Sequence, residues 1–114
     1  MKTGELIGKI PDTDATVLLD FGPDGSFGVD KATWLVGSDP VDTIIEPTTT
    51  RKTIAHEFRA MLSQPPQSPD GDAQLFLRDD ADEGAYAYFD VAKVKVSKAV
   101  VRLYAGAFRC GGGW

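Results

Sequence analysis

The sequence has few of the residues that cross-link a chain or cross a membrane. It contains a single cysteine, Cys110, and a single histidine, His56. One cysteine excludes an internal disulfide and favours a reducing compartment. No apolar run approaches the roughly 20 residues of a membrane-spanning helix, and the first residues lack the apolar stretch of a secretory signal. These absences predict a cytoplasmic protein that does not bind membranes.

Basic residues are outnumbered by acidic ones. The chain of 114 residues has 12 Lys and Arg against 17 Asp and Glu, which gives a net charge of −5. Phosphate contact needs clustered Lys and Arg, so a nucleic-acid partner is not expected. The length and the hydrophobic fraction of 42% fit one globular domain with its own core. An acidic domain of this kind is suited to docking on the basic surface of another protein.

Catalytic and metal-binding residues are not expected. A nucleophilic hydrolase needs a base beside its Ser or Cys, whereas His56 falls on the polar side of a predicted helix and nothing in the sequence links it to Cys110. The acidic clusters at 12–14, 70–72 and 79–83 lack the ligand spacing of a calcium loop. We therefore predict no catalytic residue, no metal site and no cofactor.

One amphipathic helix is predicted near the middle of the chain. Hydroxyl side chains at 48–50 are suitable N-caps, and Pro65 with Pro66 ends the helix. Its apolar stripe is formed by Ile54, Ala55, Phe58, Met61 and Leu62.

Strands are predicted on both sides of this helix. Gly, Pro and Asp residues at 22–25 and 38–40 mark turns. The segments expected to be extended are 16–21, 26–36, 41–46, 73–78, 85–91, 93–98 and 100–108. Strands, one helix and further strands predict an α+β fold, with a mixed β-sheet packed on one amphipathic helix.

Four residues are candidates for a contact surface. Arg51 and Lys52 lie at the expected helix N-terminus, where cations oppose the helix dipole. They form either a small basic patch for an acidic partner or a solvated helix end. Tyr86 and Tyr88 share one face of a strand with Asp90. They are either exposed contact residues or are covered by the helix.

The segment after the last predicted strand is rich in glycine. It reads Arg109-Cys110-Gly111-Gly112-Gly113-Trp114. Glycine loses the most conformational entropy on ordering. The segment is either a frayed end or a thin peptide that enters a narrow channel of another protein.

The element order and this tail resemble the ubiquitin-like modifiers of the β-grasp fold, particularly the bacterial relatives. In this resemblance the first hairpin comprises 29–36 and 41–46, the third strand includes 74–77, and the last strand is 101–108. The resemblance implies an N-terminal extension or added hairpin with an extra strand segment, a β-grasp-like core and a flexible tail, at residues 1–28, 29–108 and 109–114.

The resemblance also implies a function. A peptidase would remove Trp114, and an activating enzyme would then adenylate the carboxylate of Gly113 for conjugation to a target amine. Arg109, Gly111 and Gly112 would be recognised in the tail. The implied partners are the peptidase and the activating and conjugating enzymes.

The net charge and the absence of a catalytic constellation favour a second hypothesis as strongly as the resemblance favours the first. The chain would then be an acidic, non-catalytic interaction protein. It could be an inhibitor from a phage or mobile element that occupies a basic-surfaced target, or a small structural component of a larger assembly.

Overall fold

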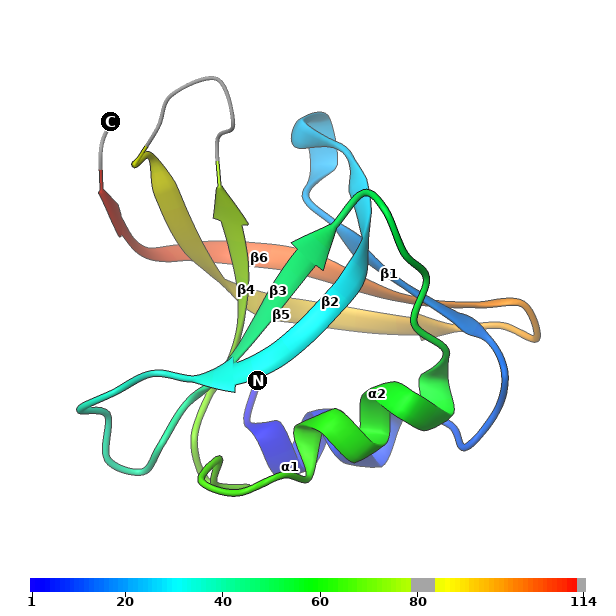
Figure 1. Cartoon of the computed structure of the whole chain (residues 1–114), viewed down its shortest axis with the longest axis horizontal. Helices are drawn as coiled ribbons and strands as arrows, with labels where there is room; N and C mark the ends of the chain where they lie inside the picture. The colour runs from blue at the N-terminus through cyan, green and yellow to red at the C-terminus, as the bar shows by residue number, and fades with distance from the viewer. Residues whose placement is uncertain (79–83, 113–114) are drawn as a thin grey trace.

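The computed structural model describes residues 1–78 and 84–112, which form a closed barrel of six strands with two short helices (Figure 1). Turn residues separate the strands, as at Gly22, whose φ of 66° suits glycine. In chain order the elements are α1 (Thr3–Lys9), β1 (Thr16–Asp20), the 3₁₀ turn η1 (Gly22–Asp24), β2 (Ser26–Trp34), β3 (Thr43–Thr48), α2 (Ala55–Leu62), β4 (Ala73–Arg78), β5 (Tyr86–Val96) and β6 (Val100–Gly112).

The barrel closes through two parallel strand pairs. Neighbouring strands pair antiparallel except at β3–β4 and β1–β6. The β1–β6 ladder runs from Thr16 opposite Val100 to Asp20 opposite Tyr104. It therefore joins the first and last strands of the chain, so that every strand has a neighbour on both sides over at least part of its length.

The predicted β-grasp fold, a mixed sheet packed on one helix, is wrong. The sheet curls into a barrel and its apolar face points inward, so it needs no long helix lying across it. The first 28 residues, expected as an extension or added hairpin, contain α1, β1, η1 and the start of β2. β1 is a barrel strand between β2 and β6.

The core fills the inside of the barrel. Along β1, Val17 and Leu19 are fully buried, while Leu18 and Asp20 on the other face are partly exposed. This alternation is the period of two that places every second side chain inside. Burying a Val or Leu side chain contributes about 1.5–3 kcal/mol. Other fully buried members of the core are Leu6, Val29, Ile45, Phe58, Leu75, Val101 and Leu103.

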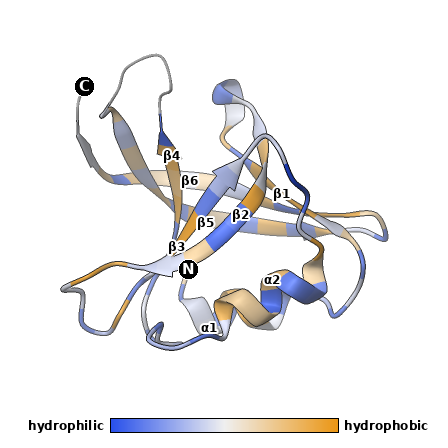
Figure 2. Ribbon diagram, in the orientation of Figure 1, coloured by the Kyte–Doolittle hydropathy of each residue, from blue (hydrophilic) through white to orange (hydrophobic). Residues whose placement is uncertain are grey.

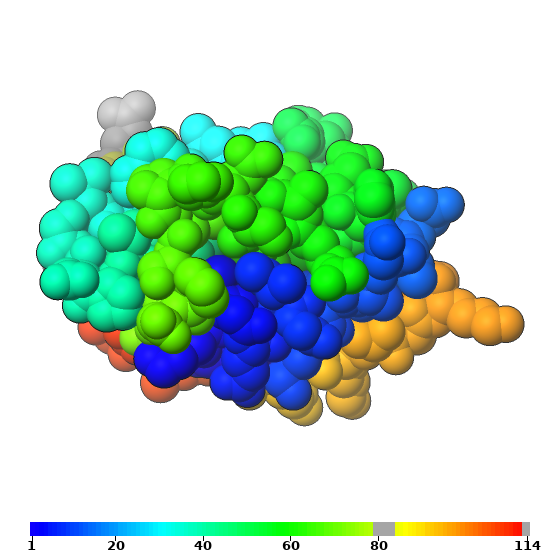
Figure 3. All heavy atoms as spheres, turned by 90° about the horizontal axis from the view of Figure 1, so that it is seen from below, coloured from blue at the N-terminus to red at the C-terminus, as the bar shows by residue number. Residues whose placement is uncertain are grey.

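The two helices lie together at one end of the barrel. The predicted central helix is confirmed as α2, and Ala55, Phe58 and Leu62 of its apolar stripe are buried. Figure 2 shows polar and apolar residues mixed along α2 and the strands, as expected for elements that bury one face. Seen from this end in Figure 3, the N-terminal segment and the segment around α2 lie side by side.

Two details of the helical prediction are wrong. The N-cap of α2 is Ile54, which makes no side-chain capping bond, while Thr48 belongs to β3. Helix α1 was not predicted at all. Its seven residues are too few to show a clear helical period, and so short a helix depends on tertiary packing, here through buried Leu6.

Candidate functional site

The candidate site is a cleft in the barrel wall between β3 and β4. These strands pair in parallel only from Thr43 opposite Ala73 to Ile45 opposite Leu75. Beyond this point they diverge toward their carboxyl ends (Figure 1). Over Glu46–Thr48, β3 pairs with β2. Over 76–78, β4 pairs with β5. Among the described strand pairings, each of these segments therefore has a partner on one side only.

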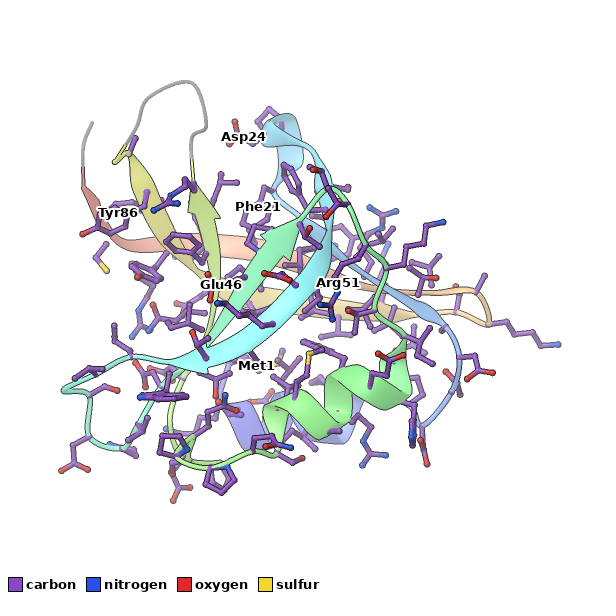
Figure 4. All side chains as sticks on the ribbon, in the orientation of Figure 1. Met1, Phe21, Asp24, Glu46, Arg51 and Tyr86 are labelled. Carbon is purple, nitrogen blue, oxygen red and sulfur yellow. The ribbon has the colours of Figure 1, made fainter. Side chains whose placement is uncertain are left out.

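A pocket of about 270 Å³ occupies the cleft. Its volume is just below the roughly 300–1,000 Å³ of pockets that enclose drug-sized ligands, so it suits one or two side chains. Phe27 and Leu77 give it an apolar floor, and both are half-buried. The other lining residues are Glu46, Pro47, Thr48, Thr49, Phe76 and Arg78. Figure 4 marks the position of Glu46 on β3.

Three aromatic side chains form a patch on the outer face of β4 and β5 beside the pocket. The ring centroid of Phe76 lies 5.2 Å from that of Tyr88 and 6.3 Å from that of Tyr86, and the two tyrosine rings are 5.7 Å apart. Tyr86 is 38% exposed. We call Phe76, Tyr86 and Tyr88 the aromatic patch. Because Phe76 also lines the pocket, the patch and the cleft form one continuous surface.

The pocket floor rests on a row of phenylalanine rings. Phe27 packs edge-on against Phe21 at 5.7 Å, and Phe21 packs against Phe89 at 6.0 Å. Phe89 in turn packs against Phe108 at 5.9 Å. Aromatic pairs of this geometry contribute about 0.5–1.5 kcal/mol beyond the area they bury. The row therefore holds Phe27 in place at the base of the cleft.

Charged and polar groups surround the aromatic patch. Glu46 accepts a hydrogen bond from Thr33 at 3.4 Å and lies 3.8 Å from the Lys31 ammonium group. Burial raises the pKa of Tyr88, and Tyr86, Cys110 and Glu46 raise it further. The Tyr88 hydroxyl can therefore donate a hydrogen bond to a ligand over an even wider pH range than an ordinary tyrosine.

Of the four predicted contact residues, the structure groups two. Tyr86 and Tyr88 lie on the outer face with Phe76, while the helices pack at the end of the barrel. Arg51 is elsewhere, 3.6 Å from Asp30, and Figure 4 shows it well separated from Tyr86. Lys52 is exposed in the segment that precedes α2.

The predicted tail residues are part of the sheet as far as residue 112. Gly111 pairs with Ala87, and Gly112 pairs with Tyr86. A Cβ atom on Gly112 would lie 3.0 Å from the ring of Tyr86. Glycine at this position therefore has a structural role, because it lets the ring lie close to the backbone. The predicted conjugation residue Gly113 and the predicted processing residue Trp114 lie outside the described residues.

Arg109, predicted as a recognition residue of the tail, forms ion pairs within the barrel. Its guanidinium group donates to Asp90 at 2.9 Å and to Asp72 at 3.1 Å. Its pKa is raised, since these two carboxylates outweigh the lowering effect of burial. The side chain connects β6 to β5 and to Asp72, the residue that precedes β4.

The only histidine, His56, pairs with Asp12 on the surface and not with Cys110. This contact raises the pKa of His56 and lowers that of Asp12. Cys110 is exposed on β6 opposite Tyr88. Within residues 1–78 and 84–112, no group of three or more His, Cys, Asp or Glu side chains is placed to hold a metal ion.

The sequence interpretation missed Phe76 and Phe27. Phe76 stands in an alternating segment between Leu75 and Leu77, which gave no sign that its ring stays near the surface. A usable signal was the closeness in sequence of the predicted strands 73–78 and 85–91, because strands so close in sequence commonly pair antiparallel, and that pairing places Phe76 opposite Tyr88. Phe27 lines the pocket because β3 and β4 separate after Ile45 and Leu75, and no local sequence pattern indicates that separation.

Searches with protein-family models, curated proteins and solved structures gave no match to this chain. Among the helices of the described segments, none has the length and apolar character needed to cross a membrane.

Proposed function

We propose that this protein is a non-catalytic binding domain, which holds an extended segment of a partner protein in the cleft between β3 and β4. The observation that carries the proposal is the one-sided pairing of β4 over residues 76–78 beside a pocket with an apolar floor and a polar rim. Strand edges with unused N–H and C=O groups accept an added strand from another chain. This makes the second of the two sequence-based hypotheses, an interaction protein, the one we favour.

The added strand would pair with β4 and not with β3. Pro47 in β3 has no N–H group, and proline is a common means of blocking strand addition at an edge. Phe76, Leu77 and Arg78 all keep their N–H groups. Main-chain hydrogen bonds along β4 would supply affinity for any extended segment.

The pocket and the aromatic patch would supply specificity. Side chains on a bound strand alternate in direction, so one would enter the pocket above Phe27 and its neighbours would face outward. An apolar side chain fits the floor formed by Phe27 and Leu77. Tyrosine side chains such as Tyr86 and Tyr88 are frequent hot spots in protein interfaces.

The test starts with peptides of 12 residues selected from a random display library on the immobilised protein. A fluorophore on Cys110, which is exposed beside Tyr88, reports peptide binding without any engineered cysteine. Tyr86→Ala should weaken binding at least about tenfold, as hot-spot truncations do. Trp34→Ala is the matched control, because this exposed aromatic residue lies at the opposite end of the β2–β3 pair.

Backbone methylation of the selected peptide tests the binding mode. In strand addition only every second amide of the peptide bonds to β4. Methylating the peptide nitrogens that face β4 should therefore abolish binding, whereas methylating the nitrogens between them, which face away, should leave binding nearly unchanged. A uniform effect along the peptide, or equal losses in Tyr86→Ala and Trp34→Ala, would refute the proposal.

The modifier hypothesis has lost the element order on which it partly rested, because the β-grasp prediction is wrong. Its remaining basis is the glycine segment, of which Gly111 and Gly112 are paired with β5. Conjugation through Gly113 stays an untested prediction.

A further inference from the structure

The charges of the chain are segregated along the sequence. All 17 acidic residues precede residue 91, and the segment from 91 to the end carries five basic residues and no acidic one. This segment includes most of β5 and all of β6. The turn of the β5–β6 hairpin projects from the body of the barrel (Figure 1 and Figure 3). An acidic protein therefore presents one distinctly basic element.

The basic side chains gather on the outer face of the hairpin. Lys93 lies opposite Tyr104, and Lys95 lies opposite Arg102. The ammonium groups of Lys93 and Lys95 lie 4.7 and 5.9 Å from the centre of the Tyr104 ring. We call Lys93, Lys95, Arg102 and Tyr104 the basic face.

The side chains of the basic face are held in position. Cation–π contacts fix the two lysines over Tyr104. The Arg102 guanidinium donates to Asp20 at 3.1 Å and to Ser26 at 3.0 Å. A shallow depression of about 350 Å³ lies alongside, bordered by Lys95, Arg102 and Tyr104 together with the hairpin turn. An incoming anion would therefore meet ordered charges, with little side-chain entropy left to lose.

One juxtaposition on the basic face is unfavourable for folding. Like charges directly opposite each other on neighbouring strands are destabilising, and Lys95 faces Arg102 in this way. Asp20 pairs with Arg102 and reduces this repulsion, while Lys93 and Lys95 have no acidic partner among the described side chains. An anionic ligand bound across the face would relieve the repulsion.

We propose that the basic face binds an extended acidic segment of a partner protein, at a site separate from the cleft. Lys93 and Lys95 are two residues apart on one strand, which spaces them by about 6.8 Å. Every second side chain of an extended peptide has the same spacing, so alternating carboxylates would match the two lysines. The net charge of −5 repels a long polyanion such as nucleic acid, whereas a short acidic segment contacts the hairpin alone.

The probe is a fluorescein-labelled peptide in which glutamate and threonine alternate over ten residues. Fluorescence anisotropy near physiological salt gives its Kd. The double variant Lys93→Gln/Lys95→Gln should bind about tenfold more weakly, since two ion pairs are lost. The control Lys2→Gln/Lys9→Gln makes the same change in net charge at exposed positions elsewhere, and should keep its Kd within about twofold.

Two comparison ligands test the stated chemistry. A peptide of the same composition with its five glutamates in one block should bind more weakly than the alternating peptide. A ten-nucleotide oligothymidylate should also bind more weakly. Equal binding of both peptides would refute the spacing argument, and tighter binding of the oligonucleotide would assign the face to nucleic acid. If both double variants lost peptide affinity equally, the loss would come from net charge and not from the basic face, and the proposal would be overturned.

Stability provides an independent check. Lys95→Glu places an acidic group opposite Arg102, and this gain offsets the lost cation–π contact with Tyr104. Its thermal midpoint should therefore stay within about 2 °C of the wild type or exceed it, while peptide binding falls. A clearly lower midpoint would show that Lys95 stabilises the fold, and would remove the argument that the face is kept for binding.

Discussion

Substituting Gly71 tests the packing that positions β3 against β4. A Cβ atom built on Gly71 would lie 2.0 Å from the carbonyl oxygen of Val41, although ordinary contacts begin at 3.4 Å. The obstacle is backbone, so no side-chain rotation relieves it. Gly71 also accepts a hydrogen bond from the Thr3 amide at 2.8 Å, and the neighbouring Asp72 carbonyl accepts one from Thr43 at 2.9 Å. Gly71→Ala must therefore move a segment that is hydrogen-bonded to α1 and to β3.

The expected loss of stability follows from these contacts. Overpacking costs about 1–3 kcal/mol, and losing one hydrogen bond adds about 0.5–1.5 kcal/mol. We expect Gly71→Ala to lose about 2–4 kcal/mol of unfolding free energy in urea titrations. At about 4 °C per kcal/mol for a domain of this size, the thermal midpoint should fall by about 8–16 °C.

Gly8→Ala is the matched control. Gly8 lies within α1, and no atom comes within 4 Å of the position of its Cβ. Alanine there should stabilise the protein by about 0.5–1 kcal/mol. If Gly71→Ala melted within about 2 °C of the wild type, the close approach of Val41 to Gly71 would be refuted, and with it the packing of the β3–β4 junction.

Three further predictions address separate features. Folding raises the pKa of His56, so the contact with Asp12 stabilises the protein fully below the unfolded pKa near 6.5, and this stability is lost as the pH rises through the raised pKa. In Asp12→Asn the NMR titration midpoint of His56 should fall. An unchanged midpoint would contradict the pairing. Thr53→Val removes a buried 2.7 Å hydrogen bond to a carbonyl of β2 and should cost about 1–3 kcal/mol in urea titrations, whereas a neutral result would contradict that bond. The modifier hypothesis predicts that intact-mass spectrometry of the protein from its native host finds a chain without Trp114 or a chain attached to another protein through Gly113. A full-length, active protein without an adduct would contradict it.

Local elements were largely predictable because local patterns encode them. The stripe containing Ala55, Phe58 and Leu62 located α2, since a helix buries residues at intervals of three and four. Turn residues and alternation located most of the strands. The tyrosines of the aromatic patch were recognisable as candidate contact residues from their alternation with small apolar neighbours.

The closure of the barrel could not be read from the same patterns. Thr16 and Val100 are neighbours across a parallel ladder, although they lie 84 positions apart in sequence. Alternation shows that a strand has one buried face, but it does not identify the strand beside it. A sheet covered by a helix and a sheet curled on itself share this pattern, which is why the β-grasp expectation failed.

The sequence by itself determined a small acidic domain, the position of its central helix and the alternating faces of its strands. It also contains the segregation of charge, because the order of charged residues is fixed before folding. Only the tertiary structure decided that β3 and β4 diverge after Ile45 and open a pocket above Phe27. It likewise brought Lys95 opposite Arg102 through the register of the β5–β6 hairpin. Both sites depend on which strand lies beside which and in what register. Pairing depends on how the whole set of apolar faces is buried together, and no local segment contains that information.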